Sequence, residues 1–101
     1  MNERTVRYVR KLSGEEALKR YILVLKESQK LFPKPGIPFK VTIDGQEVET
    51  EIKLNEVWNQ GSRNPSVEYH IDLSKHVELF RPHFGQTITL TQIDDSTYEL
   101  K

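Results

Sequence analysis

Apolar and polar side chains alternate over residues 39–54, on both sides of the dipeptide Asp44-Gly45. Asp-Gly accepts the positive φ angles of a type I′ turn, so the pattern predicts a β-hairpin with one buried and one solvated face. Val41 and Ile43 share the buried face of the first strand, because side chains alternate between the two faces of a strand. The buried face of the second strand is expected to hold Val48, Thr50, Ile52 and Leu54.

Other segments also have the character of strands. Residues 67–73 alternate, and their inward side chains are expected to be Val67, Tyr69, Ile71 and Leu73. Between this strand and the hairpin, residues 58–66 are rich in Gly, Asn, Ser and Pro, which is typical of an exposed loop. Strands are also predicted over residues 5–9, 87–93 and 97–100.

The N-terminal forty residues allow two interpretations. Ser13 and Glu16 have the spacing of a capping box, which predicts that a helix begins after Ser13. Apolar residues at helical intervals favour one long helix reaching Phe32. The apolar run at residues 21–25 equally suits a buried strand between a short helix at 14–19 and another at 27–32. Periodicity leaves both alternatives open.

The chain has 101 residues, enough for one small domain and too few for two, so residues 1–101 are expected to form a single domain. It has no cysteine, which excludes disulfides, thiolate zinc sites and cysteine nucleophiles. It also has no run of eighteen apolar residues and no pattern of a secretory leader. We therefore expect a cytoplasmic protein, or a nuclear one in a eukaryote, with no membrane partner.

The net charge is zero, but the two signs are unevenly distributed along the chain. Residues 1–40 hold ten Lys or Arg and four Glu, whereas residues 41–101 hold five Lys or Arg and eleven Asp or Glu. This asymmetry predicts a polarised surface, if the fold does not mix the two halves in space.

No constellation of residues indicates catalysis, a cofactor or a metal. His70, His76 and His83 have spacings that match no compact ligand motif, and His70 and His83 are expected on the surface. Ser13 lacks the glycine-flanked turn of a hydrolase nucleophile. The sequence also lacks a phosphate-binding loop and a dinucleotide fingerprint. We therefore predict a protein that is not an enzyme and that needs no cofactor.

Four segments together resemble a known family. They are residues 20–33, an apolar run and short helix ending in Phe32-Pro33; the hairpin around Asp44-Gly45; Val57-Trp58-Asn59; and residues 80–90, in which Gly85 leads into a strand. Their order and spacing are similar to those of the DNA-binding pseudobarrel family, which includes the DNA-binding domains of plant auxin-response and abscisic-acid-response transcription factors and the effector-binding domains of some restriction endonucleases. The resemblance implies a mainly β fold with short helices, an open and mostly antiparallel pseudobarrel of seven strands.

The resemblance also implies sequence-dependent binding of double-stranded DNA through two arms that grip the major groove. The first arm corresponds to residues 10–14 and 19–20, and the second to residues 58–64. Its implied DNA contacts are Arg10, Lys11, Ser13, Lys19, Arg20, Trp58, Asn59, Gln60, Ser62, Arg63 and Asn64. The alternative is a β-barrel module that binds another protein, through the acidic second half, and does not bind nucleic acid.

Two hypotheses about side chains follow from these arms. The first is that one connected cationic face holds Arg7, Arg10, Lys11, Lys19 and Arg20. The second is that Arg63 reads a guanine, because a guanidinium can form a forked contact with guanine O6 and N7. Trp58 could stack on a nucleotide, but a single tryptophan in a small domain more often packs partly into the core, which is the role that we expect.

Overall fold

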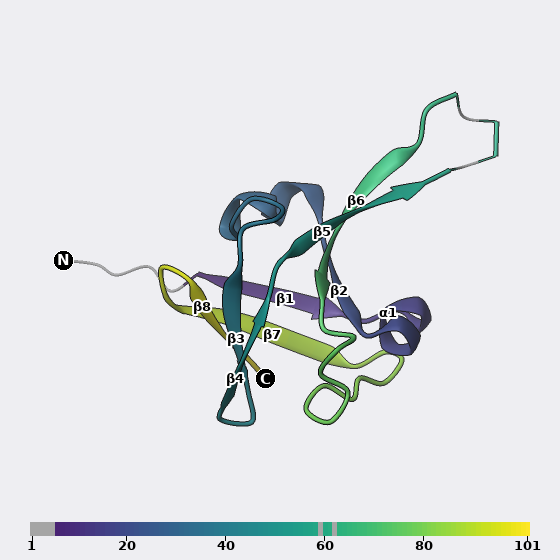
Figure 1. Ribbon diagram of the computed structural model, residues 1–101. Coiled ribbons are helices and arrows are strands. Elements are labelled where there is room, and N and C mark those ends of the chain that lie inside the picture. Colours follow the sequence, from purple (N-terminus) through teal and green to yellow (C-terminus); the bar gives the residue numbers. More distant parts are fainter. Residues whose placement is uncertain (1–5, 59, 62) are drawn as a thin grey trace.

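The computed structural model describes residues 6–58, 60, 61 and 63–101. These residues form a mainly β fold with two short helices (Figure 1). In chain order the elements are β1 (Arg7–Lys11), α1 (Gly14–Lys19), β2 (Tyr21–Val24), the 3₁₀ helix η1 (Lys26–Leu31), β3 (Phe39–Ile43), β4 (Gln46–Thr50), β5 (Ile52–Val57), β6 (Ser66–Asp72), β7 (Thr87–Asp94) and β8 (Thr97–Leu100).

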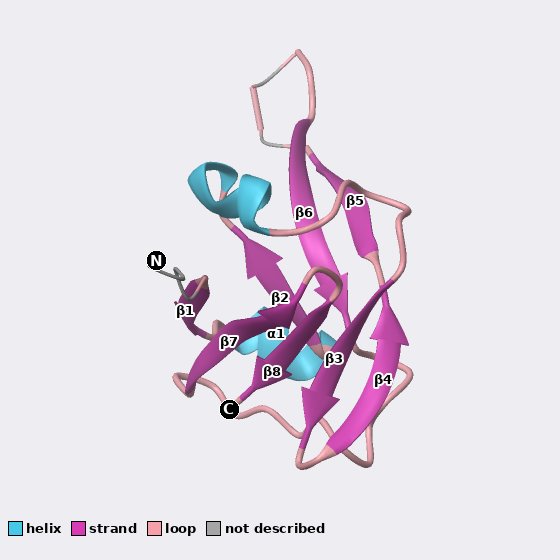
Figure 2. Cartoon of the chain, turned by 90° about the vertical axis from the view of Figure 1, so that its left-hand side faces the viewer, coloured by secondary structure: helices cyan, strands magenta, loops and turns pink. Residues whose placement is uncertain are grey.

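The strands form two open sheets, seen from the side in Figure 2. One sheet has the order β1-β7-β8-β3-β4, and the other has the order β2-β6-β5. Neighbouring strands are antiparallel except β3 and β8, which are parallel. The described residues contain no closed barrel, and they form eight strands where seven were expected.

The eighth strand arises from a break at Glu51 in the second strand of the predicted hairpin. Thr50 belongs to β4 in the five-stranded sheet, and Ile52 belongs to β5 in the three-stranded sheet. The Thr50 hydroxyl donates a hydrogen bond of 2.5 Å to the carbonyl oxygen of Asp72 on β6. This bond anchors the chain where it passes from one sheet to the other.

The apolar faces of the two sheets enclose one core. Ile22, Ile71 and Leu73 contribute fully buried side chains from the side of the three-stranded sheet, and Val41 does so from the five-stranded sheet. An aromatic cluster of Phe32, Phe39 and Tyr98 belongs to the same core, with ring centroids 4.9–6.3 Å apart. With no disulfide in the chain, burial of these side chains is the main source of stability.

The N-terminal segment adopts the interpretation with short helices. Ser13 caps α1, and both hydrogen bonds of the predicted capping box are present. Helix α1 ends at Arg20, whose backbone is left-handed, and residues 21–24 then form β2. The long helix does not form, because the apolar run at residues 21–24 pairs with β6 and is buried there.

The turn of the predicted hairpin is confirmed. Asp44 has a φ of 51° and Gly45 a φ of 79°, as a type I′ turn requires. Among the described residues, no helix is both long and apolar enough to cross a membrane.

Candidate nucleic-acid interface

The β5–β6 hairpin extends well beyond the two sheets (Figure 1). Its ladder runs from the pair Ile52 and Ile71 to the pair Val57 and Ser66, and the chain between these last two residues forms the tip. We call residues 54–69 the arm. The arm corresponds to the loop that was predicted to be exposed, together with the strand ends that support it.

Two residues of the arm differ from the sequence prediction. Leu54 and Val67 were expected inward, but they are 57% and 51% exposed. The ladder places both on the same face as Ile52 and Ile71, so the predicted alternation is correct. The inward prediction is wrong because the hairpin continues past the edge of the core, where that face has nothing to pack against.

The tip of the arm corresponds to the second predicted arm, whose polar side chains are among the implied DNA contacts. Gln60, Arg63 and Asn64 are exposed there, and Asn59 and Ser62 lie outside the described residues. Trp58 is 64% exposed, so the prediction that it packs into the core is wrong. The tryptophan follows β5 directly, where the hairpin has already left the core. Its indole is available to a partner.

The first predicted arm is the β1–α1–β2 connection. Lys11 ends β1 with an exposed side chain, and no acidic residue of the described chain pairs with it. The hydroxyl of Ser13 accepts a hydrogen bond from the Glu16 amide as the helix cap. Lys19 forms an exposed ion pair with Glu15 at 3.5 Å. Arg20 ends the helix and is partly buried.

Arg10 does not lie on an exposed cationic face. Its guanidinium forms two hydrogen bonds with the Glu16 carboxylate, 2.8 Å from Nη2 and 3.2 Å from Nε. Arg10 projects toward the interior side of β1, whereas Arg7 and Lys11 occupy the alternate, exposed positions. The predicted connected face of five cations is therefore wrong for Arg10.

Glu16 is fully buried, and sequence reasoning missed its role beyond the helix cap. Its carboxylate also accepts hydrogen bonds from the backbone amides of Ser13 and Leu23. Burial alone would raise the pKa of Glu16, but the hydrogen bonds from Arg10, Leu23 and Ser13 outweigh it and lower the pKa below its ordinary value. The same hydrogen bond to Glu16 raises the pKa of Arg10.

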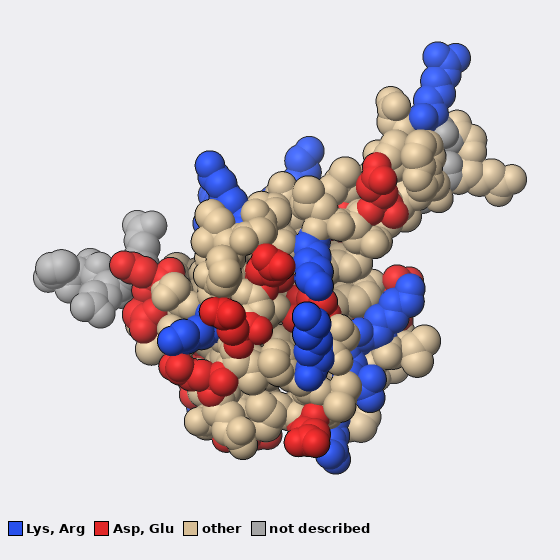
Figure 3. All heavy atoms as spheres, viewed as in Figure 1, with Lys and Arg blue, Asp and Glu red and all other residues tan. Residues whose placement is uncertain are grey.

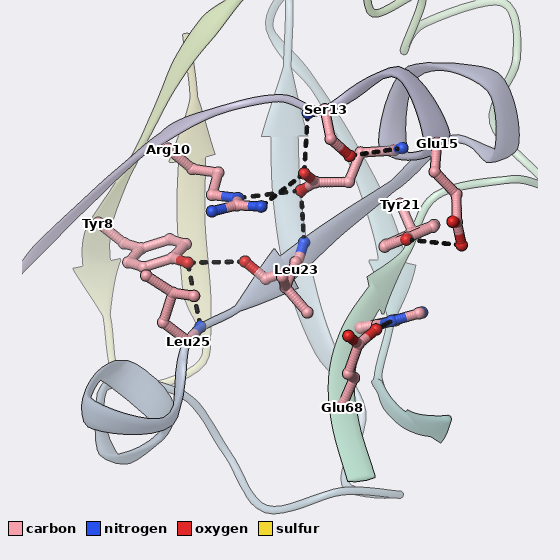
Figure 4. A network of polar contacts seen from close by, with 10 residues as sticks. Tyr8, Arg10, Ser13, Glu15, Tyr21, Leu23, Leu25 and Glu68 are labelled. Atoms are coloured by element: carbon pink, nitrogen blue, oxygen red, sulfur yellow. Dashed lines mark hydrogen bonds and ion pairs between the residues drawn. The ribbon is translucent and has the colours of Figure 1, made fainter. Parts of the chain in front are cut away.

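Tyr8 completes this polar network, which joins the two sheets (Figure 4). In the described chain no backbone ladder connects β1 to β2. Instead, the Tyr8 hydroxyl donates to the carbonyl oxygen of Leu23 at 2.6 Å and accepts from the amide of Leu25 at 3.2 Å. We call the following contacts the seam: those of Tyr8 with Leu23 and Leu25, that of Glu16 with Leu23, and the ion pair of Arg10 with Glu16. The signal for it in the sequence was the alternation along residues 7–11, which places Tyr8 and Arg10 on one face of the strand and Arg7, Val9 and Lys11 on the other.

His70 also differs from its predicted position on the surface. It is half-buried, and its ring stacks on that of Tyr21 at a centroid distance of 3.8 Å. Its Nε2 atom lies 3.0 Å from the Glu68 carboxylate. The described residues contain no group of three or more side chains that could hold a metal ion.

The arm and helix α1 lie on the same side of the molecule in Figure 1. In the space-filling view of Figure 3, the outline is hollowed between the arm and the part of the molecule near α1. Arg63 is exposed in the tip of the arm, and it is the only Lys or Arg between Lys53 and Lys75. Many acidic side chains gather in the lower left of this view, away from the arm.

No protein-family model matches the chain, and no curated protein matches it either. The function is therefore inferred from the geometry and chemistry of the described residues.

Proposed function

We propose that this protein binds double-stranded DNA in a sequence-dependent way, with the arm in the major groove and the β1–α1–β2 connection on the phosphate backbone. The observation that carries the proposal is the projecting arm, whose tip exposes Trp58, Gln60, Arg63 and Asn64. No catalysis is part of the proposal.

The shape of the arm suits the major groove, which is about 12 Å wide and admits a two-stranded β-ribbon. Its side chains suit the edges of the bases. An arginine can form a forked contact with guanine, and glutamine or asparagine can pair with adenine N6 and N7. The exposed apolar side chains of Leu54 and Val67 could contact thymine methyl groups.

The β1–α1–β2 connection supplies cations on the same side of the molecule as the arm. Lys11 and Lys19 are exposed and suit contacts with phosphate oxygens, which position a protein on DNA without reading sequence. Ser13 keeps its hydroxyl hydrogen as a donor, because in the cap its oxygen only accepts. Arg10 is excluded from this role in our proposal, because Glu16 already holds its guanidinium.

The order of the strands supports the same proposal. Counting β4 and β5 as one strand bent at Glu51 gives seven strands, the number that the resemblance implies. The arm and the β1–α1–β2 connection occupy the places along the chain that the resemblance assigns to the two DNA-gripping arms.

The experiment that tests this function is a selection of binding sites from a random duplex library, followed by affinity measurements over a range of salt concentrations. We expect tighter binding to the selected site than to random duplex, and affinity for both that falls steeply with salt. A matched variant replaces residues 58–65 by Asn-Gly, which joins the paired residues Val57 and Ser66 by a two-residue turn. This variant should fold, retain salt-dependent binding to random duplex and lose the preference for the selected site. If the intact protein binds no duplex at low salt, the proposal is wrong.

The apolar face of the arm favours a second candidate function, binding to another protein. Leu54 and Val67 lie on one face, Trp58 follows them at the tip, and exposed apolar side chains with an aromatic anchor are typical of protein interfaces. The acidic second half of the chain would then favour a basic partner. Absence of duplex binding, together with capture of a defined protein that the variant with the shortened arm does not capture, would favour this candidate.

A further inference from the structure

Strand β1 has an open outer edge. It is the outermost strand of the five-stranded sheet and pairs with β7 on one side only. Val6 and Leu12, at the two ends of β1, direct their backbone hydrogen bonds to the β7 side. Because backbone groups alternate in direction along a strand, those that point away from β7 belong to Arg7, Val9 and Lys11.

These outward backbone groups have no partner within the described part of the chain. Neither a backbone group nor a side chain there bonds to the amides and carbonyls of Arg7, Val9 and Lys11. The side chains of all three residues are exposed. Since buried backbone groups are almost always paired, the unpaired groups of β1 face solvent, where another strand can reach them.

The other three edge strands are protected by contacts with other segments. On β2, side chains of the seam bond to both backbone groups of Leu23. On β5, the loop before β3 donates a backbone hydrogen bond to the carbonyl oxygen of Ile52. On β4, Nε2 of His76 lies 3.3 Å from the carbonyl oxygen of Glu49. Proteins commonly cover strand edges in this way, and among the described strands β1 is the edge that lacks such a contact.

The side chains along this open edge are cationic. Arg7 and Lys11 are exposed on the outer face of β1, with Val9 between them. Their partners across the β7 ladder are the uncharged Thr91 and Thr87. No acidic side chain of the described residues forms an ion pair with either cation. The edge therefore presents two uncompensated positive charges, one on each side of an exposed valine.

These charges determine which strand can bind. A second copy of β1, paired antiparallel about Val9, would place Arg7 opposite Lys11, and like charges directly opposite each other destabilise a strand pair. We infer that β1 binds an extended acidic peptide of another protein as an additional strand. Acidic side chains at positions i and i+4 of the peptide lie opposite the two cations, and an apolar side chain at i+2 lies opposite the valine.

This inference goes beyond DNA binding and does not rest on it. Lys11 also belongs to the β1–α1–β2 connection, so an acidic peptide and DNA would compete for this cation. The experiments below contain no DNA, so their outcome is independent of the proposed function.

The first experiment measures amide hydrogen exchange by NMR, with the peptide acetyl-Thr-Glu-Thr-Val-Thr-Glu-Thr-amide as the probe. In the protein alone, the amides of Arg7, Val9 and Lys11 should exchange rapidly, whereas β7 protects those of Tyr8 and Arg10. Saturating peptide should slow the three outward amides by about tenfold or more. Unchanged exchange of these amides at the highest soluble peptide concentration would overturn the inference.

Two kinds of control peptide separate strand addition from general charge attraction. A strand directs alternate amides toward its neighbour, so N-methylation of the valine amide and N-methylation of the following threonine amide should have different effects. Only one of the two should abolish the protection. A peptide with lysine in place of both glutamates should give no protection. Equal behaviour of the two methylated peptides, or equal protection by the lysine peptide, would overturn the inference.

Variants of the protein test the same edge. Arg7→Glu combined with Lys11→Glu should lower the affinity for the acidic peptide by about tenfold or more and should create binding of the lysine peptide. Lys40→Glu reverses an exposed cation on β3 of the same sheet and should keep the affinity of the unmodified protein. Retained affinity in the double variant would contradict the inference. Protection of the outward amides that rises with protein concentration, without peptide, would assign the edge to a second copy and also overturn it.

Discussion

The seam and the arm use similar polar residues in opposite ways. In the seam, Arg10 is 20% exposed and forms hydrogen bonds with a buried carboxylate. In the arm, Arg63 is exposed, and no acidic residue of the described chain pairs with it. An arginine in a predicted binding segment can therefore either support the fold, as Arg10 does, or remain accessible to a partner, as Arg63 does. The difference depends on whether a carboxylate of the same chain lies close enough to bind the guanidinium.

The difference has an energetic cause. A buried charge is costly unless its partner and its hydrogen bonds are complete, so removing one partner of the seam leaves another buried and unsatisfied. Replacing an exposed side chain such as that of Arg63 leaves no buried charge uncompensated. Substitutions in the seam should therefore lower stability, and substitutions in the arm should alter binding alone.

The largest expected effect is that of Glu16→Gln. This change removes the charge that compensates Arg10 and weakens the acceptor of the Ser13 and Leu23 amides. We expect the free energy of unfolding at pH 7 to fall by about 3–5 kcal/mol in a urea titration. Glu15→Gln is the matched control, since its exposed ion pair with Lys19 contributes at most about 1 kcal/mol. Equal effects of the two substitutions would show that the seam does not hold the sheets together.

A smaller effect is expected for Tyr8→Phe. The substitution retains the ring, which packs edge-on against Phe32, and removes only the hydroxyl. The carbonyl oxygen of Leu23 and the amide of Leu25 then lose their partner, which should lower the free energy of unfolding by about 1–3 kcal/mol. Combined with Glu16→Gln, the loss should be smaller than the sum of the two single losses, because both substitutions act on β2. Strict additivity would mean that the seam is two independent contacts.

Low pH should decrease the stability of the protein, because Glu16 and Asp72 then become protonated. Burial would raise the pKa of Asp72, but hydrogen bonds from Lys53 and Ser74 outweigh it and lower the pKa to about 2. The ordinary pKa is 4.5 for Glu16 and 3.8 for Asp72. Because folding lowers both pKa values, each carboxylate stabilises the folded state fully at a pH above its ordinary pKa. This stabilisation is lost as the pH falls through the pKa of the folded state. The melting temperature should therefore decline as the pH is lowered from about 5 to 2. The Asp72→Asn variant should have a lower melting temperature than the unmodified protein at pH 7, and its melting temperature should decline less between pH 4 and 2. If the melting temperatures of both proteins declined equally, the acid sensitivity would come from other residues.

The smallest effect on stability is expected for Trp58→Ala in the arm. The side chain is largely exposed and belongs to no part of the core, so the free energy of unfolding should change by less than about 0.5 kcal/mol. The same variant should bind the selected duplex more weakly. A loss of stability comparable with that of Tyr8→Phe would show that Trp58 supports the fold.

The sequence allowed the Asp44-Gly45 turn, the capping box and the strands outside residues 21–25 to be predicted, because each depends on local periodicity or on a local hydrogen bond. For residues 21–25 it left a strand and a long helix as alternatives. It did not allow the sheet change at Glu51 to be predicted, because that change depends on a contact with Asp72. Leu54 and Val67 have the alternation of core residues, and only the length of the hairpin beyond the core explains their exposure. Sequence reasoning gave Arg10 a DNA contact and Glu16 a place in the helix cap, whereas their ion pair depends on how β1 and α1 pack together.

The most direct test of the contrast between seam and arm is the affinity of Arg63→Ala for the selected duplex, measured beside its free energy of unfolding. The account predicts an affinity loss of about 5- to 150-fold on the selected duplex, equivalent to about 1–3 kcal/mol, a much smaller loss on random duplex and unchanged stability. Lys40→Ala, which removes an exposed cation on β3, is the matched control and should keep the preference for the selected site. Unchanged affinity of Arg63→Ala for the selected duplex would contradict the account.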